Sequence, residues 1–194
     1  MIGAVVLAAG ESRRMGENKL LLEIGGRRVI ELIISSFDGV VDELIVVLGH
    51  KPESVVPVLK KLGAKWVVNE NYIEGMASSF KKGLDRLKHC DAVFLALGDQ
   101  PFVDRDFILK AIDAWKGGAK IVSPAYKGKR GHPVLFDKSL FDEIFSLKKH
   151  EMVRDVIHRH AGEHRSVEAG EWAIVDLDTP EDFRSFVEVR HVNI

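Results

Sequence analysis

The 194-residue chain has one cysteine, no long apolar run and almost no net charge, and each shortage excludes a class of protein. The single cysteine, Cys90, excludes an internal disulfide and a cysteine-based metal cluster, and it fits a reducing compartment. No apolar run reaches the ~20 residues that a membrane helix needs. The net charge of −1 supplies no general positive field to hold a nucleic acid. We therefore expect neither a membrane protein nor a nucleic-acid-binding protein.

Internal repeats, low-complexity tracts and linkers are also missing. The first residues carry neither the positive segment nor the small-residue cleavage site of a secretory signal, so we expect a cytoplasmic protein. What the composition does contain is 46% hydrophobic and 29% charged residues, which suits one α/β domain with a substantial core. We expect residues 1–194 to form that single domain.

Apolar strand-like runs alternate with helical patterns, which is typical of a mostly parallel sheet covered by helices on both faces. The runs predict strands at residues 4–9, 44–48, 65–68, 92–97, 121–122, 134–136 and 172–175. The helical patterns fall at residues 29–37, 52–62, 76–87, 107–115, 138–145 and 152–160. Asp104 is placed to cap one helix, and Thr179 with Asp182 predicts the start of a final helix.

The loop after the first strand combines glycines with cations. Glycines let the chain turn and bring backbone N–H groups close to an anion, and Arg14 and Lys19 add full positive charges. Such a loop suits a triphosphate, although it is not a Walker loop, because Lys19 is followed by Leu20. The alternative is an ordinary strand-to-helix turn with solvated cations. The loop residues in question are Gly10, Ser12, Arg13, Arg14, Gly16 and Lys19.

Acidic residues follow two other expected strands. Asp99 comes just past residues 92–97, at the edge where open α/β sheets bind ligands. Asp176 and Asp178 follow residues 172–175 and, being two apart, would face the same way, so that they repel unless a cation such as Mg²⁺ lies between them. The alternatives are a turn role for Asp99 and solvated or capping roles for the pair. We expect Asp99 and one of the pair to bind Mg²⁺.

The cationic loop and the two acidic strand ends together fit Mg²⁺-dependent transfer on a nucleoside triphosphate. Such chemistry relies on positioning and charge stabilisation, so it needs no nucleophilic side chain.

Five segments, in this order along the chain, resemble the signature of the MobA-like nucleotidyltransferases. The likeness covers almost the whole chain, and within the family it is strongest to the branch that transfers a cytidylyl group. Guanylyl-transferring members usually read Leu-Ala-Gly-Gly in the first segment and Asn-Ile-Asn in the last. The segments are residues 7–22, Gly75-Met-Ala-Ser-Ser79, Gly98-Asp-Gln-Pro101, Gly131-His-Pro-Val134 and Asp176-Leu-Asp-Thr-Pro-Glu-Asp182.

The resemblance implies a nucleotide-diphospho-sugar transferase fold, a single Rossmann-like three-layer α/β domain with a mixed, mainly parallel sheet. It also implies transfer of CMP from CTP to a molybdopterin-type acceptor with release of pyrophosphate, and a molybdoenzyme or its chaperone as partner. Three alternatives stay open. They are guanylyl transfer from GTP to the same acceptor, a sugar or polyol phosphate as acceptor, and a non-catalytic nucleotide-binding module that delivers a cofactor.

The resemblance also assigns roles by position. Lys19 and Arg14 would hold the triphosphate, Lys19 would stabilise charge on the α-phosphate, and Asp99 would bind Mg²⁺ with Asp176 or Asp178. Nucleotide-binding roles fall on Leu7, Ala8, Ala9, Gly10, Ser12, Arg13 and Gly16, and acceptor-binding roles on Gly75, Ser78, Ser79 and His132.

The acceptor-side roles have structural rivals. The two serines could simply form hydrogen bonds at a helix N-terminus, and the histidine could be a turn residue. The basic residues Lys127, Lys129 and Arg130 could contact the acceptor phosphate or be solvated.

Overall fold

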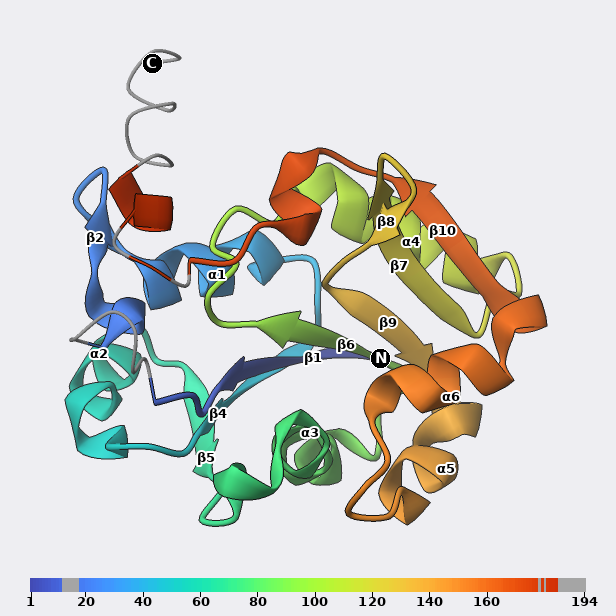
Figure 1. The fold of residues 1–194 in the computed structure, drawn as a ribbon, viewed down its shortest axis with the longest axis horizontal. Coiled ribbons are helices and arrows are strands. Elements are labelled where there is room, and N and C mark those ends of the chain that lie inside the picture. Colours follow the sequence, from blue (N-terminus) through green and yellow to red (C-terminus); the bar gives the residue numbers. More distant parts are fainter. Residues whose placement is uncertain (12–17, 178, 180, 185–194) are drawn as a thin grey trace.

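The computed structural model describes residues 1–11, 18–177, 179 and 181–184, and it builds them around one eight-stranded sheet (Figure 1). The strand order is β10-β7-β9-β6-β1-β4-β5, and β8 pairs with β7. A separate two-stranded hairpin, β2 (Glu23–Ile24) and β3 (Arg27–Arg28), precedes the first helix. The sheet strands are β1 (Ile2–Ala8), β4 (Glu43–Leu48), β5 (Lys65–Val68), β6 (Ala92–Leu97), β7 (Ile121–Tyr126), β8 (Lys129–Arg130), β9 (Val134–Asp137) and β10 (His164–Glu168).

The pairing is mainly parallel, as the sequence predicts. Strand β1 lies between β4 and β6 and is parallel to both, β4 continues in parallel to β5, and β7 pairs in parallel with β10. Strand β9 runs antiparallel to β6 and to β7, and the short β8 is antiparallel to β7. The register pairs Leu7 with Leu97, so β1 and β6 end at the same level of the sheet.

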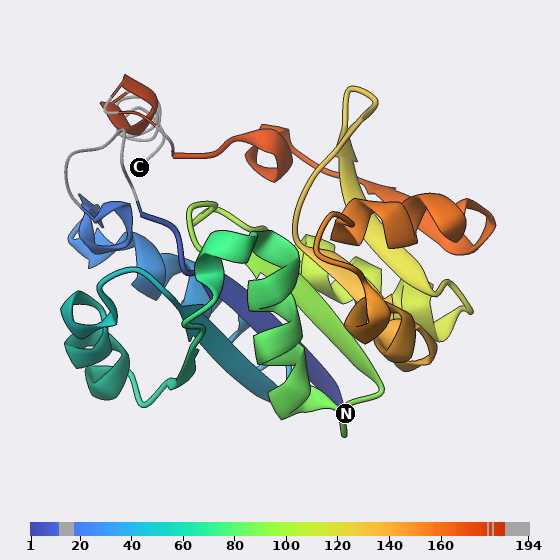
Figure 2. The same cartoon turned by 60° about the horizontal axis from the view of Figure 1, so that its bottom comes forward.

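Helices cover both faces because the central strands alternate their apolar side chains between two cores. In β1, Ala4 and Val6 belong to one core, and Val5 belongs to the other. The first core is closed by α1 (Val29–Phe37), α2 (Val56–Lys61) and α4 (Arg105–Lys116). The second is closed by α3 (Met76–Leu84), α5 (Phe141–Ser146) and α6 (Val153–Arg159), and Figure 2 shows α3 lying across the strands. The expected three-layer arrangement is confirmed.

The predicted helix starts agree with the observed caps. The side chain of Asp104 accepts a hydrogen bond from the Asp106 N–H at the start of α4. Asp182 N–H donates to the Thr179 hydroxyl, and Thr179 N–H donates to the Asp182 carboxylate, which is the reciprocal pattern of a capping box. Three predicted helices are in part 3-10 turns. One turn precedes α2 at Pro52–Ser54, one follows α3 at Asp85–Leu87, and one precedes α5 at Lys138–Leu140.

The strand predicted at residues 172–175 is wrong, since Glu171–Ile174 forms a 3-10 turn. Packing decides its shape: Ala173 is fully buried, and the Trp172 ring packs against Phe107 with ring centroids 5.5 Å apart. The last strand of the sheet is instead β10, which the sequence analysis missed because only Val167 in it is apolar.

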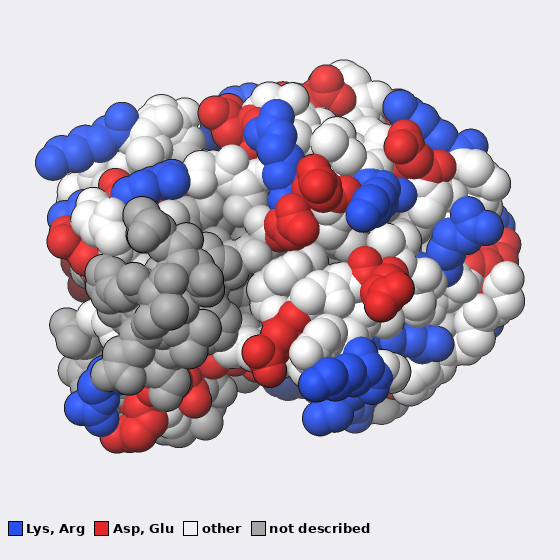
Figure 3. Space-filling view, turned by 90° about the horizontal axis from the view of Figure 1, so that it is seen from above, with Lys and Arg blue, Asp and Glu red and all other residues white. Residues whose placement is uncertain are grey.

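Positive and negative side chains are interspersed over the face seen in Figure 3. Within the described ranges, no helix is long and apolar enough to cross a membrane.

Gly83 offers a test of how tightly α3 packs on the sheet. A Cβ added there would lie 2.5 Å from Val5 Cγ1 and 2.8 Å from Val47 Cγ2. We expect Gly83→Ala to lower the free energy of unfolding by about 1–2 kcal/mol in chemical denaturation, because overpacking outweighs the gain in helix propensity. Gly162→Ala is the control, since its Cβ would meet nothing within 4 Å. Equal stability of the two variants would contradict this packing.

Candidate functional site

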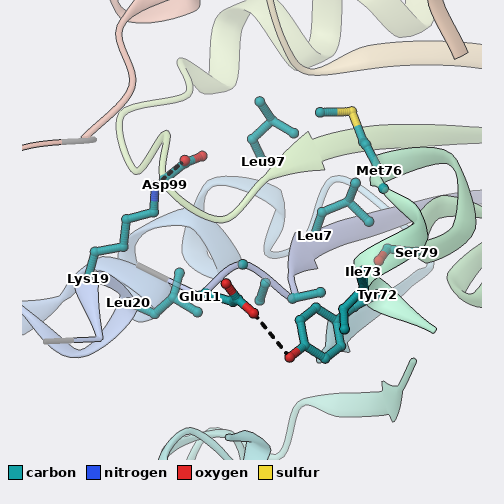
Figure 4. Close-up of a pocket in the computed structure, with 14 residues that line it drawn as sticks. Leu7, Glu11, Lys19, Leu20, Tyr72, Ile73, Met76, Ser79, Leu97 and Asp99 are labelled. Atoms are coloured by element: carbon teal, nitrogen blue, oxygen red, sulfur yellow. Dashed lines mark hydrogen bonds and ion pairs between the residues drawn. The ribbon is translucent and has the colours of Figure 1, made fainter. Parts of the chain in front are cut away.

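A pocket of about 670 Å³ opens where β1 and β6 end (Figure 4). The carboxyl ends of parallel strands are the edge at which open α/β sheets bind ligands. Its wall is mostly apolar, with a few charged and polar groups. The lining residues are Leu7, Ala8, Ala9, Gly10, Glu11, Lys19, Leu20, Tyr72, Ile73, Gly75, Met76, Ser79, Leu97 and Asp99.

Lys19 and Asp99 form an ion pair at one end of this pocket. The distance from Lys19 Nζ to Asp99 Oδ2 is 2.5 Å, and the side chains are 14% and 21% exposed. Lys19 begins a 3-10 turn that Asn18 caps by accepting a hydrogen bond from the Leu20 N–H. Asp99 follows Gly98, whose N–H donates to the carbonyl of Leu7 at 2.8 Å. Both predicted residues therefore reach the same point from separate loops.

Gly98 is required for that approach of β6 to β1. A Cβ at this position would lie 2.8 Å from the Leu7 carbonyl oxygen and 3.1 Å from Leu20 Cδ2. The glycine of the Gly98-Asp-Gln-Pro101 segment thus has a packing reason.

Asp176 lies next to Asp99, although it does not follow a strand as predicted. The Leu177 N–H donates to the Asp99 carbonyl at 3.2 Å, and the Leu177 side chain is buried. Gln100, which is 4% exposed, donates from Nε2 to Asp176 Oδ1 at 2.7 Å. Asp176 therefore lies near Asp99, as expected. Hydrogen bonds with Asp99 and Gln100 hold it there, whereas the prediction relied on its position at the end of a strand.

His132 lies beside these acids and carries an unusual proton affinity. Its ring atom Nδ1 lies 3.4 Å from the Leu95 carbonyl, and its backbone N–H donates to the Ala173 carbonyl. Burial lowers the pKa of His132 below its ordinary value, and the Leu95 carbonyl and the charges of Asp176 and Asp99 act in the opposite direction. The imidazole is therefore neutral at neutral pH.

The opposite end of the pocket is formed by the start of α3. Gly75, with φ +104°, and Ser79 line the pocket, as their predicted acceptor roles require. Ser78 and His132 do not line it, and Ser78 instead faces a second cavity beside Lys81 and Lys82.

Sequence reasoning missed a polar part of the pocket wall made by Tyr72 and Glu11, with His50 in contact with the Tyr72 hydroxyl. The Tyr72 hydroxyl donates to Glu11 Oε1 at 3.4 Å, and it lies 3.3 Å from His50 Nδ1. Gly49 makes room for the ring, since a Cβ there would lie 2.7 Å from Tyr72. The available signal was an aromatic and an aliphatic residue, Tyr72 and Ile73, in an otherwise polar loop.

The other predicted site residues lie outside the described part of the chain. Their nucleotide-binding, catalytic and metal-binding roles stay predictions. They are Ser12, Arg13, Arg14, Gly16 and Asp178.

The described residues suit a hard divalent cation next to phosphate. Asp99 and Asp176 supply carboxylate oxygens, which Mg²⁺ prefers, and a Mg²⁺ ion usually keeps waters and shares phosphate oxygens. Across the described residues no cluster of three His, Cys, Asp or Glu could hold a metal alone. The set therefore fits a cation that a bound triphosphate helps to hold, with Lys19 at hand for phosphate charge.

Comparison with known proteins gives one family, and its relatives include molybdenum cofactor nucleotidyltransferases. The profile of the MobA-like NTP transferase domain matches residues 4–165. The molybdenum cofactor cytidylyltransferase of Escherichia coli K12 is 27% identical over 186 residues, which are 94% of this chain and 93% of that protein. The molybdenum cofactor guanylyltransferase of Mesorhizobium japonicum is 28% identical over 201 residues, covering 93% and 92%.

Among solved structures, Rv0371c from Mycobacterium tuberculosis H37Rv superimposes with a TM-score of 0.85 at 30% identity. The match covers 97% of this chain and 98% of that one. A second crystal structure of Rv0371c, in complex with manganese, gives a TM-score of 0.80 at 28% identity, covering 96% and 98%.

The lowered pKa of His132 predicts how stability depends on pH. Folded His132 binds fewer protons than unfolded His132, so its contribution makes the free energy of unfolding fall as the pH drops below 6.5. We expect wild type to lose more stability than His132→Asn between about pH 7.5 and pH 5.5 in urea denaturation. An NMR titration should give His132 a pKa below 6.5, and a higher value would contradict the burial described above.

Proposed function

Because this chain belongs to the MobA-like NTP transferase family, we propose that it transfers a cytidylyl group from CTP to the phosphate of a molybdopterin-type cofactor. Pyrophosphate is the second product. The observation that carries the proposal is the contact of Lys19 with Asp99 at the end of an open, mostly apolar pocket. That contact places a cation for phosphate beside a carboxylate for a metal ion.

The transfer is a displacement at the α-phosphorus. An oxygen of the acceptor phosphate attacks it in line, a new P–O bond forms, and the bond to the oxygen that bridges the α- and β-phosphates breaks. Pyrophosphate leaves with that bonding pair. Lys19 neutralises charge that develops on the α-phosphate oxygens. When bound, Mg²⁺ would supply further charge neutralisation between the phosphates and the carboxylates of Asp99 and Asp176.

The manganese complex of Rv0371c supports a divalent cation in this fold, since that protein is 28% identical to this chain. Our proposal of Mg²⁺ here rests on the hard oxygen ligands Asp99 and Asp176. Arg14 and Asp178 remain proposed contributors from outside the described residues.

CTP is placed before GTP because Ala9 lines the pocket, where the family resemblance gives guanylyl-transferring members a glycine. The relative in Escherichia coli is named a cytidylyltransferase. The relative in Mesorhizobium japonicum is named a guanylyltransferase, so GTP is the second candidate. A competition between CTP and GTP for the pocket separates them.

A location and a partner complete the proposal. We place the enzyme in the cytoplasm, because its triphosphate substrate is made there and its one cysteine is a free, buried thiol. The product would pass to a molybdoenzyme or to that enzyme's chaperone.

The direct test is pyrophosphate release. The protein is incubated with Mg²⁺, molybdopterin and either CTP or GTP. Pyrophosphate release with CTP supports the proposal, and release with GTP alone supports the guanylyl alternative. No release with either nucleotide contradicts both. A panel of sugar and polyol phosphates identifies a different acceptor. Tight triphosphate binding without turnover on any acceptor would indicate a delivery module.

Lys19→Ala and Asp99→Ala should each lower kcat for pyrophosphate release by about 10²–10³-fold, because each removes charge placed for the transition state. Circular dichroism should show both variants folded. Lys65→Ala and Asp85→Ala are the matched controls, since both side chains are exposed in surface ion pairs away from the pocket. Full activity of either site variant would refute the assignment.

Gln100→Ala should act as Asp176→Ala does, because Gln100 orients the Asp176 carboxylate. Loss of a group that orients a metal ligand costs about 10–100-fold in metal affinity or activity, so each variant should need more Mg²⁺ for half-maximal rate. The double variant should need no more Mg²⁺ for half-maximal rate than the more impaired of the two single variants. Additive losses would show that Gln100 acts independently of Asp176.

A further inference from the structure

Asn69, at the end of β5, is a buried amide whose orientation is fixed. The residue is 4% exposed. Its Oδ1 accepts a hydrogen bond at 3.1 Å from the backbone N–H of Asn71, a group that can only donate. The Nδ2 atom therefore points the other way, where it donates to Ser78 Oγ at 2.9 Å and to Ser79 Oγ at 3.1 Å. Rotating the amide by 180° would set donor against donor.

This amide determines which way the two serine hydroxyls point. Each serine oxygen accepts from Asn69, so each hydroxyl hydrogen must be directed elsewhere. Ser78 donates its hydrogen to the Asn71 carbonyl at 3.1 Å. For Ser79, the described residues provide a hydrogen-bond donor but no acceptor.

The unused hydrogen of Ser79 lies at the pocket. Ser79 lines the pocket while being only 3% exposed. Figure 4 places it at the far end from Lys19 and Asp99, among Leu7, Ile73 and Met76. A single oriented donor in an apolar wall is a group that recognises one atom of a ligand, because a buried polar group without a partner costs free energy.

We propose that Asn69 is a positioning residue that makes Ser79 a hydrogen-bond donor to an acceptor atom of the bound substrate. That atom is the unprotonated ring nitrogen N3 of cytosine, or an oxygen of the phosphorylated acceptor. The inference rests on the proposed function, which brings both molecules into this pocket.

The first test compares Ser79 with a serine outside the site. Ser79→Ala should weaken CTP binding in calorimetry, or raise KM for molybdopterin, by about tenfold, the factor for one buried hydrogen bond. Ser146→Ala is the control, because its exposed hydroxyl donates to the Asp142 carbonyl and does not line the pocket. It should change both constants by less than about twofold. Equal effects of the two variants would overturn the proposal.

The second test reverses the polarity of Ser79 without touching it. Asn69→Asp keeps the shape of the side chain and replaces the donating amino group by an oxygen. The Ser79 hydroxyl then donates to this oxygen and offers only lone pairs to the pocket. Cytosine has a lone pair at ring nitrogen N3 where uracil has an N–H, so the preference for CTP over UTP should fall about tenfold if Ser79 contacts the base.

If Ser79 contacts the acceptor instead, the CTP-to-UTP ratio stays constant and KM for molybdopterin rises. A merely structural effect would weaken CTP and UTP equally and leave that KM unchanged, which overturns the proposal. Calorimetry measures CTP binding without turnover. If CTP affinity depends on Ser79 but no pyrophosphate is released, the proposed function is rejected and the proposal for Asn69 and Ser79 is retained. Thermal denaturation checks the fold of Asn69→Asp. If it does not fold, the comparison of the two serine variants decides.

Discussion

The ion pair between Lys19 and Asp99 depends on the register of two central strands. The residues are 80 positions apart, and they meet because β1 and β6 run in parallel and end level. Both side chains are largely covered, so removing either one takes a close opposite charge away from a poorly solvated group. On binding, the negative triphosphate would replace Asp99 as the partner of Lys19, and a cation would replace Lys19 as the partner of Asp99. Each side chain would keep a partner of opposite charge. The contact therefore joins two loops, and in the proposed function it is also the place where the phosphates and the cation would bind.

The interior of the fold follows from sequence pattern because its strands are apolar on both faces. Residues 92–97 and 44–48 could hardly be anything but central strands. Prediction failed at the edge, where β10 buries little and where Trp172 and Ala173 find better packing in a turn. Asp176 still reached Asp99, because the Leu177 backbone and the Gln100 amide bind it there. Such side-chain partners are chosen by tertiary contacts, and no local spacing encodes them.

The same limit applies to the candidate site. Leu7 to Gly10, Lys19, Asp99, Gly75 and Ser79 line one pocket as motif order predicts. Ser78 and Ser79 are adjacent in sequence, yet only the structure shows that one faces the pocket and the other a neighbouring cavity. The contacts of the Tyr72 hydroxyl with Glu11 and His50 join three segments of the chain, and no sequence motif marks them.

Two buried amides, Asn69 and Gln100, connect the fold to its chemistry. Each is 4% exposed and lies in a loop that follows a strand. Asn69 orients the hydroxyl of Ser79, and Gln100 orients the carboxylate of Asp176. In the proposed function, the charged end of the pocket acts on the phosphates, which are the same in every nucleoside triphosphate. Recognition of the base or acceptor then falls to hydrogen-bond polarity at the other end, where a single exchange of donor for acceptor reverses the preference.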